Sequence, residues 1–199
     1  MANQITLLRL ASVFVIGAIA LYADTPWQFL NSPLIIINIL LDGLDGRIAR
    51  KHKEDSVFGA LFDIAADRII EITLWMILAK LDVVPIWIAL IYLTRGILVD
   101  NLRTPHAHQG NMPFSIVKSP LGKFLVASRT MRFVSGLIKL IAFSWLFFIM
   151  PAANTWPTVF ITNDVFISWI NNILIYISVT ICLARGLPVI LETAFNKKW

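Results

Sequence analysis

Long apolar runs separated by short polar segments dominate this chain. With about 20 predominantly apolar residues for each membrane crossing, the pattern predicts six transmembrane helices, near residues 6–25, 32–50, 57–79, 83–103, 120–150 and 164–187. These runs are too continuous for the alternating pattern of barrel strands, and a helix satisfies its own backbone hydrogen bonds in hydrocarbon. We therefore expect an all-α integral membrane bundle that forms a single domain over residues 1–199.

Basic residues predict how the bundle is oriented. The connections 23–33 and 151–163 contain no lysine or arginine, and 80–85 contains only Lys80. Basic residues gather instead at the opposite ends of the spans: Arg9, Arg47, Arg50, Lys51, Lys53, Arg103, Lys118, Lys123, Lys197 and Lys198. Because cytoplasmic loops carry the excess of lysine and arginine, we expect both termini to be cytoplasmic.

The composition agrees with a membrane protein. Hydrophobic residues make up 58% of the chain and the mean hydropathy is +0.76, which is too apolar for an ordinary soluble domain. The net charge is +5, but the basic residues lie between apolar spans and do not form one patch with interleaved aromatic residues. We therefore expect no nucleic-acid partner.

Four aspartates stand out in these apolar surroundings: Asp42, Asp45, Asp63 and Asp67. An ionised carboxylate at bilayer depth costs about 2.5 to 3.5 kcal/mol, so such residues usually bind something. The first two aspartates are three residues apart and the last two are four apart, so each pair projects from one face of a helix. The two pairs lie at facing ends of the second and third spans, which predicts a shallow site at the cytoplasmic surface.

Converging carboxylates repel one another unless cations neutralise them. With no histidine or cysteine among these positions, an all-oxygen ligand set favours Mg²⁺ or Mn²⁺ over zinc. Two such ions about 3.5 to 4 Å apart commonly assist displacement at phosphorus. The guanidinium group of Arg50 can bind a phosphate bidentately. A cation or proton transporter also uses intramembrane carboxylates, and the residues by themselves leave both functions open.

Eight residues between 42 and 67 follow the spacing DxxDGxxARx8GxxxDxxxD: Asp42, Asp45, Gly46, Ala49, Arg50, Gly59, Asp63 and Asp67. This spacing resembles the signature of the CDP-alcohol phosphotransferase family. The resemblance implies that a phosphatidyl group is transferred from CDP-diacylglycerol to the hydroxyl group of a small polar alcohol, with release of CMP. It also implies a homodimeric enzyme, which we expect in a bacterial inner (plasma) membrane with its active site facing the cytoplasm.

The resemblance also implies roles for the signature residues. Asp42, Asp45 and Asp63 would bind two divalent ions with help from Asp67, which would also be the general base. Gly46, Ala49 and Gly59 would shape the cytidine pocket, and Arg50 would bind the donor diphosphate. Near the start of the chain, Asn3, Thr6 and Arg9 form an NxxTxxR pattern that resembles the family, although helix capping and membrane topology also account for these residues.

A phosphorylated acceptor such as glycerol 3-phosphate would need a second anion site. The candidates are basic residues around the fourth and fifth spans: Arg103, Lys118, Lys123, Arg129 and Arg132. Arg129 and Arg132 lie inside an apolar run, where a topology signal is not required, although an ion pair with Asp100 or Glu71 is an alternative. The segment 119–129 resembles only the first half of the GKxKT-like segment of phosphatidylglycerophosphate synthases, so inositol phosphate also remains open as the acceptor.

Overall fold

The computed structural model describes residues 2–52, 57–108 and 119–195, and all the secondary structure in these ranges is helical. Six helices have 21 residues or more: α1 (Ala2–Tyr22), α3 (Asn31–His52), α4 (Val57–Lys80), α5 (Ile86–His108), α7 (Arg129–Thr155) and α9 (Asp164–Phe195). Three short helices are α2 (Thr25–Gln28), α6 (Pro120–Ala127) and α8 (Pro157–Thr162). The all-α prediction is therefore confirmed.

In the part of the chain that the structure describes, three of the long helices have the length and hydropathy of membrane spans. They are Asn3–Tyr22, Arg129–Thr155 and Asp164–Phe195, each with a mean hydropathy of 2.1 over its most apolar window. Helix α4 contains the charged residues Asp63, Asp67, Arg68 and Glu71, which lower its mean hydropathy. The structure therefore supports a helical membrane protein, and six spans remain a prediction.

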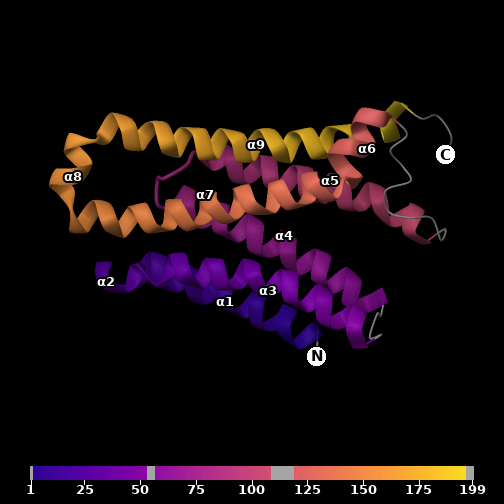
Figure 1. Cartoon of the computed structure of the whole chain (residues 1–199), viewed down its shortest axis with the longest axis horizontal. Helices are drawn as coiled ribbons and strands as arrows, with labels where there is room; N and C mark the ends of the chain where they lie inside the picture. Colours follow the sequence, from indigo (N-terminus) through magenta and orange to yellow (C-terminus); the bar gives the residue numbers. More distant parts are fainter. Residues whose placement is uncertain (1, 53–56, 109–118, 196–199) are drawn as a thin grey trace.

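The long helices form two groups that α4 and α3 join. Helix α1 packs against α3 and α4, while α9 packs against α5 and α7; contacts of α4 with α5, and of α3 with α7, link the groups. Figure 1 shows the start of α1, the end of α3, the start of α4 and the ends of α5 and α9 at one end of the bundle, and α2 and α8 at the other. This arrangement places the polar ends of α3 and α4 at the same end of the bundle as those of α5 and α9.

An aromatic core fixes the second half of α4. Trp75 is fully buried, and its ring centroid lies 5.2 Å from that of Tyr92 on α5 and 4.8 Å from that of Phe143 on α7. Buried aromatic pairs of this kind add to the stability that their apolar area supplies. Because Trp75 lies about two turns after Asp67 on the same helix, this packing also holds the aspartate-bearing turns in position.

The prediction of one continuous helix over residues 120–150 is wrong, because the helix is broken at Ser128. Ser128 has φ −60° and ψ 135°, so it separates α6 from α7. Helix α6 has its own N-cap, because Ser119 Oγ accepts a hydrogen bond from the backbone N–H of Gly122 at 3.1 Å. The serines are the missed signal, since serine favours helix starts over helix interiors. Lys123 and Arg129 consequently belong to different helices.

Helices α5 and α9 meet where Gly186 faces Arg95. A Cβ atom at position 186 would lie 2.7 Å from Arg95 Cγ, which is closer than van der Waals contact allows. We expect Gly186→Ala to lower the free energy of unfolding by about 1 to 3 kcal/mol through overpacking. Thermal unfolding in detergent micelles would measure this loss.

Gly136→Ala on α7 is the matched control for this prediction. A Cβ atom at Gly136 would meet nothing within 4 Å, so this change should stabilise the helix by about 0.5 to 1 kcal/mol through reduced backbone freedom of the unfolded chain. Equal effects of the two alanines would contradict the proposed steric role of Gly186.

Candidate metal and phosphate site

Three of the four predicted aspartates meet at one point of the structure. Asp42 comes from α3, and Asp63 and Asp67 come from α4. One carboxylate oxygen of each lies within 4.8 Å of the corresponding oxygens of the other two. The three side chains are each about two-fifths exposed, at 42%, 41% and 43%. We call Asp42, Asp63 and Asp67 the aspartate cluster; Asp45 lies one turn further along α3, and its side chain is outside the described part of the chain.

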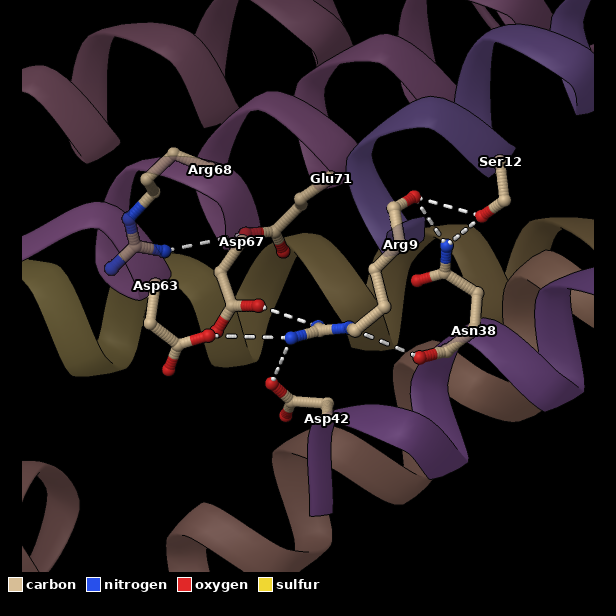
Figure 2. Close-up of polar contacts among 8 residues, drawn as sticks. All are labelled: Arg9, Ser12, Asn38, Asp42, Asp63, Asp67, Arg68 and Glu71. Carbon is tan, nitrogen blue, oxygen red and sulfur yellow. Dashed lines mark hydrogen bonds and ion pairs between the residues drawn. The ribbon is translucent and has the colours of Figure 1, made fainter. Parts of the chain in front are cut away.

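The guanidinium group of Arg9 lies within the aspartate cluster, as Figure 2 shows. Its Nη1 atom is 2.9 Å from Asp42 Oδ1 and 3.3 Å from Asp63 Oδ1. Its Nη2 atom donates a hydrogen bond to Asp67 Oδ1 at 2.7 Å. Helix α1 therefore supplies a cation to carboxylates that belong to α3 and α4.

A cavity of about 320 Å³ adjoins the cluster. Within residues 2–52, 57–108 and 119–195, its charged lining residues come from five helices: Arg9, Asp42, Asp67, Arg68, Glu71, Arg132, Lys139 and Arg185. Five of these eight are basic and three are acidic, which gives this set a formal excess of two positive charges. A cavity with this excess is suited to binding an anion next to the aspartates.

Glu71 organises one wall of this cavity. It is buried and lies one turn after Asp67 on α4, where it forms ion pairs with Lys139 of α7 and, at 3.3 Å, with Arg68. Arg68 also donates to Asp100 of α5, with Nε 2.7 Å from Oδ2. Asp100 and Glu71, which the sequence analysis named as alternative ion-pair partners of Arg129 and Arg132, form ion pairs with Arg68 and Lys139. This network connects α4 to α5 and α7.

The cavity lining also contains two arginines connected by a serine. Arg185 of α9 donates from Nη1 to Ser135 Oγ, and Ser135 Oγ in turn donates to the backbone carbonyl of Arg132 at 2.9 Å. Ser135 is buried. The Nε atom of Arg185 is also buried and has no hydrogen-bond partner within residues 2–52, 57–108 and 119–195. Because a buried donor without a partner is costly, this atom is a natural contact for a bound anion.

The aspartate cluster fits a hard divalent cation. All the ligand atoms on offer are carboxylate oxygens, which suit Mg²⁺ and Mn²⁺, and the position of Arg9 shows that these oxygens attract positive charge. Metal ions next to an anion-binding cavity are an arrangement suited to chemistry on phosphate groups.

Sequence comparison identifies the family. The family model of CDP-alcohol phosphatidyltransferase matches residues 1–184. The chain belongs to the CDP-alcohol phosphatidyltransferase family. This membership agrees with the resemblance carried by the aspartate signature, and it favours a transferase over the transporter that the residues alone left open.

Individual relatives in the family differ in their acceptor alcohols. The chain is 27% identical over 173 residues to the CDP-diacylglycerol–glycerol-3-phosphate 3-phosphatidyltransferase of Bacillus subtilis, and the aligned region covers 80% of this chain and 88% of the relative. It is 30% identical over 105 residues to the enzyme of the same name from Cereibacter sphaeroides, and this aligned region covers 51% of this chain and 48% of the relative. A Helicobacter pylori CDP-diacylglycerol–serine O-phosphatidyltransferase is 38% identical over 58 residues, 29% of this chain and 24% of the relative.

The other signature residues of the family lie on the two helices that carry the aspartates. Gly59 is on α4, one turn before Asp63. Gly46, Ala49 and Arg50 are on α3, and their side chains are outside the described residues. The structure thus agrees with a signature that spans two helix ends, and the roles of these four residues remain predictions.

The predicted acceptor residues are spread more widely. Arg132 lines the cavity. Lys123 on α6 and Arg129 at the start of α7 are exposed and are not among the lining residues. Arg103 is on α5 with its side chain outside the described part, and Lys118 falls wholly outside it. Of the five predicted acceptor residues, Arg132 is the one that lines the described part of the cavity beside the aspartate cluster.

Three basic cavity residues, Arg68, Lys139 and Arg185, were missed by the sequence analysis. Lys139 and Arg185 lie in α7 and α9, inside apolar sequence that has the hydropathy of a membrane span. A charged residue within such a run is expensive and usually functional, which is the argument that singled out Arg132. Applied to every apolar run, the same argument would have found Lys139 and Arg185.

Proposed function

We propose that this protein transfers the phosphatidyl group of CDP-diacylglycerol to the hydroxyl group of a phosphorylated polyol such as glycerol 3-phosphate, and releases CMP. The observation that carries the proposal is that one cavity is lined by aspartates of the signature, Asp42 and Asp67, and by the basic residues Arg132 and Arg185. The first group suits a metal-bound diphosphate, and the second suits the phosphate of an acceptor. Inositol phosphate would satisfy the same basic residues.

The aspartates are proposed to hold two Mg²⁺ or Mn²⁺ ions, with ligands from Asp42, Asp45, Asp63 and Asp67. These ions would supply neutralisation of the charge on the diphosphate and on the departing CMP. Arg50 would bind the donor diphosphate, and Gly46, Ala49 and Gly59 would allow the cytidine to approach the backbone closely. The acyl chains of the donor would stay in the bilayer between helices.

Asp67 is proposed as the general base. Its carboxylate takes the proton of the acceptor hydroxyl, while the acceptor oxygen forms a bond to the phosphorus of the phosphatidyl group. The bond between that phosphorus and the bridging oxygen of CDP breaks, and CMP leaves with the bonding electrons. A positioned base contributes to such a step when it lies within reach of the proton, and Asp67 lines the cavity in which the acceptor is proposed to bind.

Arg132 and Arg185 are proposed to bind the acceptor phosphate, with Lys139 on the same cavity surface. Arginine offers a planar fork of donors that matches phosphate oxygens. Arg103, Lys118, Lys123 and Arg129 are retained as proposed outer contacts that attract the anion from the cytoplasm. An acceptor without a phosphate, such as serine, would place no anion beside Arg132 and Arg185.

In the membrane, we propose six spans with both termini and the active site on the cytoplasmic side of a bacterial plasma membrane. The arrangement of helix ends in Figure 1 supports this alternation, because the start of α1, the end of α3, the start of α4 and the ends of α5 and α9 lie at the same end of the bundle. We also propose that the enzyme is a homodimer, as the family resemblance implies.

Release of CMP tests the proposed function. Purified protein with CDP-diacylglycerol and Mg²⁺ or Mn²⁺ should release CMP in the presence of glycerol 3-phosphate or inositol phosphate, and much more slowly with serine. Chelation of the divalent ions by EDTA should stop the release. Failure with every acceptor, together with ion flux in liposomes that Asp63→Asn abolishes, would contradict the transferase.

A further inference from the structure

Arg9 is an unusually buried charge for a residue so close to the start of the chain. Only 3% of its surface is exposed, and its guanidinium contacts all three members of the aspartate cluster. The same three carboxylates each have an oxygen close enough to the others to share a metal ion. The guanidinium therefore lies in the space where metal ligands converge.

The position of Arg9 is built into the packing of α1 against α3. Arg9 Nε donates to the backbone carbonyl of Asn38 at 3.3 Å, and Asn38 Nδ2 donates back to the carbonyl of Arg9 at 2.8 Å. The same amide donates to Ser12 Oγ at 2.6 Å, as Figure 2 shows. These bonds anchor the stem of Arg9 and leave its Nη1 and Nη2 atoms directed at the carboxylates.

The charges of the cluster and of Arg9 bear on metal binding. The three carboxylates carry a formal charge of −3, and the guanidinium of Arg9 carries +1 at 2.7 to 3.3 Å from their oxygen atoms. A divalent ion bound by the same carboxylates would lie close to this positive charge. Like charges this close repel strongly at the dielectric constant of a protein site. Binding of the metal therefore weakens the contacts between the guanidinium and the carboxylates, and these contacts oppose binding of the metal.

We propose that Arg9 is an internal cation that competes with divalent metal for the aspartate cluster and thereby sets the metal affinity of the site. This inference rests on the metal-dependent function proposed above. In the absence of metal, Arg9 holds three carboxylates together that would otherwise repel one another. When metal is present, Arg9 limits how tightly it is held. Arg9 is a positioning residue for the metal ligands.

Binding of Mn²⁺ to the full-length protein in detergent, followed by electron paramagnetic resonance, tests the competition. Arg9→Gln removes the charge and should lower the dissociation constant for Mn²⁺ by on the order of tenfold or more. Arg9→Lys keeps the charge and should bind Mn²⁺ much as the unmodified protein does. Lys80→Gln is the matched control, because it removes an exposed positive charge at the far end of α4. An Arg9→Gln variant that binds Mn²⁺ no more tightly, or does not bind it, overturns the proposal.

Thermal unfolding in EDTA tests the same role without metal. Arg9→Gln should lower the melting temperature, and adding Asp63→Asn to this variant should recover part of the loss because one repelling carboxylate is gone. No loss in Arg9→Gln, or no recovery in the double variant, overturns the proposal. Neither measurement depends on turnover. If the protein releases no CMP with any acceptor, the proposed function is refuted, and these two measurements still decide the role of Arg9.

Discussion

Asp67→Asn should reduce the rate of CMP release by about 10² to 10⁴, the usual contribution of a general base. Asparagine has nearly the same shape, and its amide oxygen can still accept the hydrogen bond that Arg9 donates to Asp67. It cannot take up the proton of the acceptor hydroxyl. We therefore expect the variant to keep part of its affinity for Mn²⁺ and for CDP-diacylglycerol while it loses turnover. Single-turnover CMP release and Mn²⁺ titration would measure the two properties separately.

Asp42→Asn is the comparison variant for this prediction. Asp42 belongs to the same cluster but comes from α3, and it contacts the same guanidinium at 2.9 Å. Asp42 is a proposed metal ligand and not a proposed base. The Asp42→Asn variant should therefore lose Mn²⁺ binding, and its activity should recover in part at high Mn²⁺ concentration. Equal losses of metal affinity in both variants would contradict the division of roles between Asp42 and Asp67.

Arg185→Ala should raise the KM for glycerol 3-phosphate by about tenfold to a hundredfold, the range expected when a hydrogen bond to a charged group is lost. The KM for CDP-diacylglycerol should change much less, because Arg185 reaches the cavity from α9 and the signature residues lie on α3 and α4. Arg132→Ala should behave in the same way. Steady-state kinetics with each substrate varied in turn would measure both constants.

Two further variants sharpen this prediction. Ser135→Ala removes the hydroxyl group that accepts from Arg185 while both arginines remain, so it should raise the acceptor KM less than Arg185→Ala does. Arg129→Ala changes an exposed arginine that does not line the cavity, so its effect should also be smaller. An unchanged acceptor KM in Arg185→Ala and Arg132→Ala would reject the anion site.

The acceptor residues show where reasoning from one helix at a time fails. Residues three apart share a helix face, so spacing alone predicts that Arg129 and Arg132 act at the same anion site. The break at Ser128 makes Arg129 the first residue of α7, and Arg129 does not line the cavity, whereas Arg132 does. Ser135, one turn after Arg132, accepts a hydrogen bond from Arg185, which lies 50 residues further along the chain. Periodicity along one helix contains no information on which residue of another helix lies opposite.

The sequence by itself determined the class of fold, the family and the aspartates that are proposed to carry its chemistry. Long apolar runs require helices, and the spacing of the signature places Asp42, Asp63 and Asp67 on two helix ends whatever the details of packing. Only the tertiary structure decided which cations meet these carboxylates. Arg9 pairs with Asp67 across 58 residues of chain, and Glu71 pairs with Arg68 and Lys139. These choices depend on how α1, α7 and α9 pack around α3 and α4, because charges separated by many residues interact only when packing brings them within a few ångströms.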